Sequence, residues 1–202
     1  MLRLQKEHIK PVSQMLARAF RDELKDTFPD PIERRRKEPI ANEFYLRRDT
    51  VASHAFVSSP QLEGIAVWWR SDQKKPGIWW RMLLSGAIWL VPKLGFRSVR
   101  KMQAGDRFME QKHRQLMPEK HWYLAVLAVD PPHQGKGHGS RLVRDMLAHI
   151  DTEGLPCYVE TEGERNIAMY RRYGFEPVDE YVIPGTTETI TAMIRPAYKA
   201  AD

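Results

Sequence analysis

Apolar and polar positions in the first half of the chain predict two helices. Apolar residues recur with helical spacing between positions 12 and 25, at Val12, Leu16, Ala19, Phe20 and Leu24. This spacing predicts a helix that Pro29 and Pro31 bring to an end. A second, charged helix is expected over 32–46. Its run of charges at 33–38 indicates a solvated helix face, because acidic residues stand at both ends of the run.

Extended segments follow these helices. Residues 50–58 are rich in β-branched and small side chains, and residues 64–70 form an apolar run after a Ser-Ser-Pro turn signal. Together they predict an antiparallel hairpin. A long helical region is then expected from about 77 to 117, interrupted at Pro92 and Gly95 and ended by Pro118.

The second half of the chain alternates between strands and helices. An unbroken apolar run at 121–129 predicts a strand buried on both faces, and a glycine-rich turn follows it. The later expected elements are a helix at 140–150, a strand at 156–161, a helix at 165–173 ended by Gly174, and strands at 175–183 and 187–194. This order predicts an α+β fold with a mixed central sheet, a local βαβ unit and flanking helices, in one domain over residues 1–202.

Composition narrows the class of protein. The chain has 202 residues, of which 42% are apolar and 29% are charged, as in ordinary globular proteins. It has 32 Lys and Arg against 26 Asp and Glu, a net charge of +6 that favours anionic ligands. The single cysteine, Cys157, excludes a disulfide framework and fits a reducing compartment. The polar N-terminus lacks the apolar region of a signal peptide, so we expect a cytoplasmic protein.

One strongly apolar stretch lies at 78–91. Its fourteen residues include Arg81 and fall short of the ~20 that span a bilayer, so no integral membrane segment is expected. It is interpreted as a buried helix or as an interfacial or substrate-lining helix. The tryptophans in and near this stretch suggest an aromatic acceptor pocket, although core packing explains them equally well: Trp68, Trp69, Trp79, Trp80 and Trp89.

The segment with the clearest chemistry joins the strand at 121–129 to the next helix. It reads Gln-Gly-Lys-Gly-His-Gly from Gln134 to Gly139. Three glycines let main-chain N–H groups approach a ligand closely, and a helix N-terminus favours an anion such as phosphate. The spacing matches neither the Walker A loop nor the Gly-x-Gly-x-x-Gly of dinucleotide-binding folds. The loop therefore predicts a different phosphate-bearing ligand.

Two motifs resemble those of the GCN5-related N-acetyltransferase (GNAT) superfamily. The loop at 134–139 is similar to the family's Gln/Arg-x-x-Gly-x-Gly/Ala loop. The later pattern Asn166-x-x-x-Tyr170-x-x-x-Gly174-Phe175 resembles its closing motif. The clear resemblance covers about 120–180 and is nearest to puromycin-acetyltransferase-like enzymes. It implies the GNAT acyl-CoA N-acyltransferase fold and direct acetyl transfer from acetyl-CoA to a primary amine of a small molecule.

The resemblance also implies where acetyl-CoA would bind. The loop amides would hold the CoA pyrophosphate, with Lys136 either facing phosphate or solvated. The main chain near Leu127 and Val129 would pair with the pantetheine arm, and Asn166 and Tyr170 would contact it from the next helix. The loop residues concerned are Gln134, Gly135, Lys136, Gly137, His138, Gly139 and Ser140.

Acetyl transfer to an amine needs a base and an acid on opposite sides of the carbonyl. Asn166 and Tyr170 share a helix face, and Tyr170 matches the family's general acid. Tyr173 is the fallback and is expected to face elsewhere. Glu160 is the candidate base, or else a salt-bridging or capping residue. Strand alternation places Glu160 on the face of Tyr158, with Cys157 and Val159 on the other.

Several other functions are considered. Cys157 is interpreted as a buried structural thiol rather than a nucleophile, and the histidine spacing gives no metal site. The alternatives to a small-molecule enzyme are a CoA-binding module without catalysis and a protein or peptide N-acetyltransferase. A nucleic-acid partner is not expected, and binding through basic helices would show itself as strong salt dependence.

Overall fold

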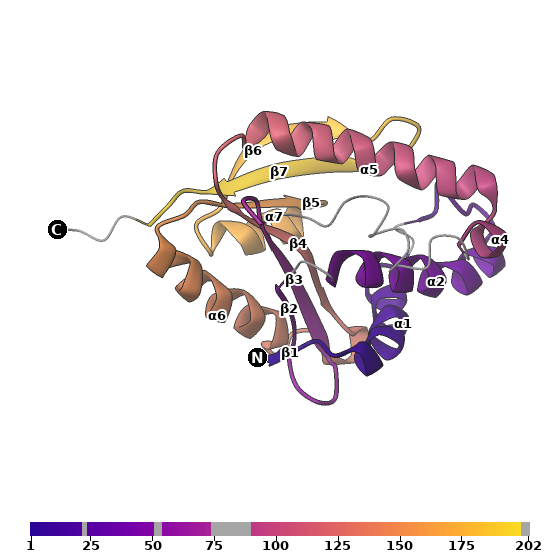
Figure 1. Ribbon diagram of the computed structural model, residues 1–202, viewed down its shortest axis with the longest axis horizontal. Helices are drawn as coiled ribbons and strands as arrows, with labels where there is room; N and C mark the ends of the chain where they lie inside the picture. The colour runs from indigo at the N-terminus through magenta and orange to yellow at the C-terminus, as the bar shows by residue number, and fades with distance from the viewer. Residues whose placement is uncertain (22–23, 51–53, 74–89, 199–202) are drawn as a thin grey trace.

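The computed structural model describes residues 1–21, 24–50, 54–73 and 90–198. Its centre is a seven-stranded sheet in the order β1-β2-β3-β4-β5-β7-β6 (Figure 1). The parallel pair is β4 with β5, and the other neighbours are antiparallel. The strands are β1 Leu2–Arg3, β2 His54–Val57, β3 Gly64–Arg70, β4 Trp122–Val129, β5 Cys157–Thr161, β6 Glu176–Val182 and β7 Thr189–Arg195. The predicted α+β fold with a mixed sheet is confirmed.

Helices cover both faces of the sheet. In Figure 1, α6 and α7 lie on one side of the sheet, and the long helix α5 lies on the other, along β6 and β7. The helix α1 packs on the same face as α5, against apolar side chains of β2, β3 and β4. The helices are α1 Ile9–Ala19, α2 Pro31–Thr50, α4 Leu90–Leu94, α5 Phe96–Leu116, α6 His138–Glu153 and α7 Glu164–Arg171, with 3-10 turns η1 Lys6–His8 and η3 Pro131–His133.

The spacing of apolar residues explains how these helices dock. Five buried residues of α6 recur at helical spacing and seal one sheet face: Leu142, Val143, Met146, Leu147 and Ile150. On the opposite face, the C-terminal half of α5 and the residue after it contact β5, β6 and β7 through Phe108, Met109, Leu116 and Met117. The sheet is therefore buried on both faces where β4 and β5 pair.

The structure corrects several predicted boundaries. The first helix ends at Ala19 rather than near Lys25, because Phe20 leaves the helical conformation. Pro31 begins α2 instead of only breaking a helix, since a proline fits the first helical position. Gly95, with a φ of 88°, separates α4 from α5 as predicted, whereas Pro92 lies inside α4.

The apolar stretch at 78–91 lies almost entirely outside the described residues, and with it Trp79, Trp80 and Trp89. The other two tryptophans of the predicted pocket, Trp68 and Trp69, are buried in β3, and Trp68 belongs to the core on the α6 face. Within the described ranges, none of the helices combines the length and the apolar character needed to cross a bilayer.

Candidate functional site

Strands β4 and β5 part at the centre of the sheet. They pair at three positions, the last of which joins Leu124 to Val159, although both strands continue beyond it. A bulge at Ala125 accompanies the parting: Leu124 pairs with Trp68 of β3 and Val126 with Val67. From Val126 to Val129, β4 thus pairs with β3 but has no described strand partner on its β5 side. The predicted pantetheine-binding residues Leu127 and Val129 lie on this free edge.

The glycine-rich loop follows β4 after the short 3-10 turn η3. Gly135 and Gly137 have φ angles of 76° and 87°, which side-chain-bearing residues adopt rarely. An added Cβ at either position would meet nothing within 4 Å, so the space in front of the loop is open. The Gln134 amide donates to the Val129 carbonyl at 3.1 Å and anchors the loop to the strand. This cradle fits a phosphate group.

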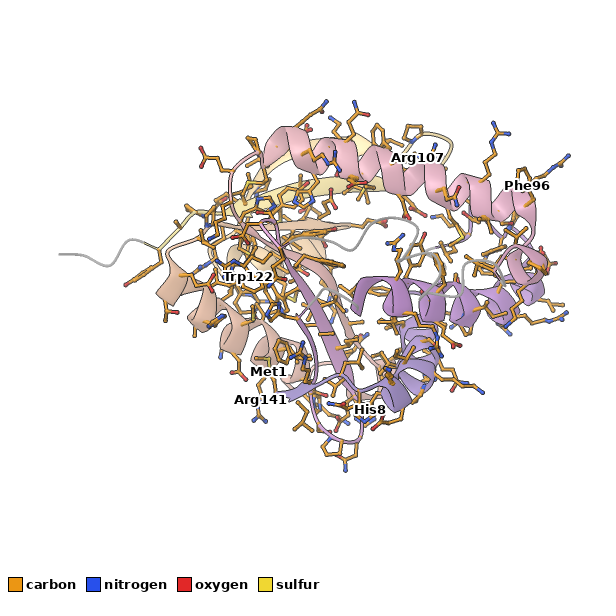
Figure 2. All side chains as sticks on the ribbon, in the orientation of Figure 1. Met1, His8, Phe96, Arg107, Trp122 and Arg141 are labelled. Atoms are coloured by element: carbon orange, nitrogen blue, oxygen red, sulfur yellow. The ribbon has the colours of Figure 1, made fainter. Side chains whose placement is uncertain are left out.

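The loop runs into α6, whose N-cap is Gly137. The first N–H groups of a helix lack acceptors within it, so those of His138, Gly139 and Ser140 are potential donors to an anion. Lys136 is exposed, and Arg141 in the first turn of α6 points outward into solvent (Figure 2). All seven predicted loop residues are therefore brought together at one end of the sheet.

Two contacts that the sequence analysis missed support this loop. Arg18 of α1 makes a bidentate ion pair with Asp130, at 2.9 Å from Nε and 2.5 Å from Nη2, and its hydrogen bond lowers the pKa of Asp130. The Tyr173 hydroxyl donates to Ser140 Oγ at 2.9 Å. The expectation that Tyr173 faces elsewhere is wrong, because the turn after α7 carries its ring toward the first turn of α6.

Glu160 lies just beyond the last position at which β5 pairs with β4, on the face that α5 covers. Its carboxylate accepts three phenol hydrogen bonds. Tyr158 and Tyr181 donate to Oε1 at 2.9 and 2.7 Å, and Tyr123 donates to Oε2 at 2.9 Å. The prediction that Glu160 shares a face with Tyr158 is confirmed. No sequence pattern indicated Tyr123 and Tyr181, which come from β4 and β6.

Burial and hydrogen bonding act in opposite directions on the pKa of Glu160. Burial raises the pKa of Glu160 above its ordinary value, and the hydrogen bonds from Tyr181, Tyr123 and Tyr158 limit the rise. Burial and the neighbouring Glu160 carboxylate raise the pKa values of Tyr158 and Tyr181. Both phenols therefore stay neutral and act as donors.

Tyr170 lies on the opposite face, among the residues covered by α6 and α7. It is 5% exposed and packs edge-on against Phe175, with ring centroids 5.6 Å apart. Burial raises the pKa of its phenol, with a smaller contribution from Cys157. Asn166 is one helical turn away but exposed, and its side chain donates to the Glu162 carbonyl. The two residues are neighbours on α7 but lie at different depths.

Cys157 is fully buried in the core on the Tyr170 side, which raises the pKa of its thiol. On the other face, His113 and His121 bring their Nε2 atoms to 2.7 Å of one another. Across the described ranges, no cluster of three or more His, Cys, Asp or Glu side chains is arranged to hold a metal ion.

The same fold occurs in solved acetyltransferases. A Corynebacterium glutamicum protein described as histone acetyltransferase HPA2 and related acetyltransferase aligns with a TM-score of 0.67 and 21% identity, over 100% of this chain and 97% of that one. The polyamine N-acetyltransferase of Drosophila melanogaster aligns with a TM-score of 0.60 and 14% identity, over 96% and 97%. At these identities the likeness concerns the fold.

Sequence comparisons identify the family. The N-alpha-acetyltransferase RimI of Mycobacterium tuberculosis is 33% identical over 61 residues, which are 30% of this chain and 39% of that protein. The three curated relatives compared are matched over 17% to 39% of their own length. The model of the acetyltransferase (GNAT) family matches residues 17–175, well over half of the chain. The protein therefore belongs to the GNAT acetyltransferase family.

Proposed function

We propose that this protein transfers the acetyl group of acetyl-CoA to a primary amine of a small molecule, directly and within a ternary complex. The observation that carries the proposal is the parting of β4 from β5 above the glycine loop. The unpaired edge of β4 offers main-chain hydrogen-bonding groups to an extended ligand. The glycine loop at the end of this edge can hold an anion, and titratable side chains lie on both faces of the sheet. Acetyl-CoA has the matching order of parts, with a thioester, a pantetheine arm and a pyrophosphate.

The loop residues 134–140 would hold the pyrophosphate through their amides, and the edge at Leu127 and Val129 would bind the pantetheine arm. Asn166 is exposed on α7 and could reach that arm if its bond to the Glu162 carbonyl opens. Ser140 is held by Tyr173, which fixes the start of α6 for the ligand. The thioester supplies an activated acetyl group in the gap between the strands.

Glu160 and Tyr170 would then act from opposite faces of the sheet. Glu160 accepts the proton that the amine loses as it is acylated, and Tyr170 donates a proton to the departing sulfur. A raised pKa brings Glu160 closer to the pH range in which it can act as a base, and a neutral Tyr170 retains the proton that it must give. This division of roles needs no covalent acetyl-enzyme.

We also propose that residues 1–202 form one acetyltransferase domain, since β1 and β7 belong to the same sheet. A cytoplasmic location is proposed because the lone cysteine fits a reducing compartment. A protein or peptide amine remains the alternative acceptor class, and a CoA-binding module without catalysis is the alternative to an enzyme.

The test is release of free CoA from acetyl-CoA, followed with a thiol reagent, against polyamines, aminoglycosides, arylalkylamines and peptide N-termini. A small amine acetylated with a kcat/KM at least tenfold above every peptide supports the proposal. A preference for peptides would move the acceptor to the alternative class. A thermal shift with acetyl-CoA but no transfer to any amine would instead identify a binding module.

A further inference from the structure

The geometry points to a positioning role for the three tyrosines around Glu160. We propose that Tyr123, Tyr158 and Tyr181, here called the phenol cluster, orient the carboxylate so that Oε2 takes the proton from the acceptor amine. The inference rests on the proposed function, in which Glu160 is the base. It adds three residues to the reaction and assigns the proton to one atom.

The phenol cluster is assembled from three different strands. Tyr123 comes from β4, Tyr158 from β5 and Tyr181 from β6. All three hydroxyls point at a single carboxylate, with distances of 2.7 to 2.9 Å. Tyr158 is completely buried and Tyr181 is 8% exposed. The three phenols are far apart in the sequence, so the packing of the whole sheet, and not a local turn, holds their hydroxyls around the Glu160 carboxylate.

The two carboxylate oxygens are not equivalent. A carboxylate offers about four lone-pair sites, two on each oxygen. Tyr158 and Tyr181 fill both sites of Oε1, whereas Tyr123 fills one site of Oε2. Oε2 is also the oxygen bonded to β4, the strand that parts from β5 at this point. The remaining acceptor site is therefore on Oε2.

The rings themselves are held by neighbouring groups from α5. His113 stacks on Tyr158 at 4.4 Å with an interplanar angle of 6°, and lies 4.5 Å from the Tyr123 ring. Phe108 meets Tyr181 edge-on at 5.7 Å. These contacts fix the directions of the phenols, and with them the direction of the carboxylate.

Titratable groups approach the cluster from α5 and β6. Lys112 lies 5.0 Å from the Tyr181 ring centroid and pairs with Asp179 of β6 at 3.0 Å. His113 is bonded to His121, which immediately precedes β4. From β7, the residue paired with Glu160 is Ala192, which does not titrate. The three phenols are the groups that bond the carboxylate itself.

Removing one phenol should therefore change the protonation of Glu160. A hydrogen bond to an ionised carboxylate stabilises the charged form, so its loss raises the pKa of Glu160. For a charge-assisted bond, the expected shift is about one pH unit. The variant Tyr181→Phe removes the hydroxyl that makes the shortest of the three bonds and keeps the ring against Phe108.

The experiment follows Glu160 in two ways. First, the protein with ¹³C-labelled glutamate is titrated by NMR without substrate, with Glu160→Gln identifying the signal. Second, kcat/KM is measured against pH with one amine for the wild type and Tyr181→Phe. The ionisation of the amine affects both proteins equally, so it does not contribute to the difference between their pH profiles. The matched control is Tyr45→Phe. In the wild type, the Tyr45 hydroxyl donates to Asp106 at 3.2 Å, and Asp106 lies on another part of α5.

We expect the NMR midpoint and the acidic limb of the rate profile to move upward together in Tyr181→Phe, and neither to move in Tyr45→Phe. A shifted NMR midpoint with an unshifted rate profile would confirm that the phenols control Glu160 but contradict its role as the base. An unshifted midpoint in a folded Tyr181→Phe would overturn the inference. If that variant does not fold, Tyr123→Phe takes its place, with the same expected shift and the same overturning result.

Discussion

The two faces of the sheet differ sharply around β5. On the α6 and α7 face, Cys157 and Val159 are buried with Tyr170 in an apolar core. On the α5 face, Tyr158 and Glu160 belong to a hydrogen-bonded network of phenols and a carboxylate. The β5 residues on the two faces are neighbours in the sequence, from Cys157 to Glu160, because successive side chains of a strand point to opposite faces.

The difference shows how the two faces of the sheet create two chemical environments next to β5. The apolar face keeps the Tyr170 phenol neutral, since burial disfavours its ionised form. The polar face supplies a carboxylate with partial charge stabilisation from three donors. In the proposed mechanism, Tyr170 as the acid and Glu160 as the base would therefore act from opposite faces of the sheet without neutralising one another.

The largest effect expected from this comparison concerns the polar face. Glu160→Gln keeps the shape and one accepting oxygen but removes the charge of the proposed base, and its amide nitrogen can only donate. We expect kcat to fall by about 10³-fold, within the usual range for general base catalysis. The thermal shift caused by acetyl-CoA should persist. The measurement is the initial rate at saturating acetyl-CoA.

The matched control is Glu180→Gln, which removes the same charge beside Tyr181 but at an exposed position of β6. It should retain the wild-type rate. Full activity in Glu160→Gln would remove the polar face from the mechanism.

The next effect concerns the apolar face. Tyr170→Phe removes only a hydroxyl and keeps the ring against Phe175. We expect kcat to fall by about 10²-fold with little change in the KM for acetyl-CoA, because proton donation belongs to the transition state. Steady-state kinetics with both substrates varied separate the two constants.

Tyr173→Phe is the comparison for this variant, and its expected behaviour follows from the Ser140 contact. Its lost hydrogen bond loosens the start of α6, so the KM for acetyl-CoA should rise a few-fold while kcat stays near the wild-type value. If Tyr173→Phe shows the large loss of kcat instead, the general acid is Tyr173.

A smaller effect is expected at the loop that both faces share. Gly137→Val places a β-branched residue at a φ of 87° and adds a side chain to the open space over the amides. We expect the thermal shift with acetyl-CoA to disappear. Gly154→Val, at the other end of α6 with a φ of 60°, carries similar backbone strain. It should lower the melting temperature but keep the shift, and equal behaviour of the two would contradict binding at the loop.

The sequence predicted the loop better than the polar face for a physical reason. Residues 134–140 are contiguous, so their spacing alone indicates the turn, the helix N-terminus and the phosphate cradle. Membership of the GNAT acetyltransferase family is confirmed by the family model, which matches residues 17–175. Strand alternation also placed Glu160 correctly relative to Tyr158 and Cys157.

The phenol cluster could not be predicted in the same way. Tyr123, Tyr158 and Tyr181 meet only because β7 inserts between β5 and β6 and because β4 pairs with β5 in one particular register. Strand order and register depend on long-range packing, which local patterns do not record. The position of Tyr173 was missed for a related reason, since the turn at Gly174 changes the direction of the chain after α7.

The smallest effect is expected at Cys157, which tests whether the apolar face takes part only through Tyr170. The thiol is fully buried and its pKa is raised by burial, so it is a poor nucleophile. Cys157→Ala should therefore leave kcat unchanged and lower the free energy of unfolding by about 1 kcal/mol, as is common for a small loss of core packing. Denaturant unfolding and initial rates measure the two quantities. In the wild type, the proposed direct transfer predicts that initial-rate lines for varied acetyl-CoA and amine intersect. Parallel lines would show instead that a covalent acetyl-enzyme forms, and an acetyl group found on Cys157 by mass spectrometry would place it on the apolar face.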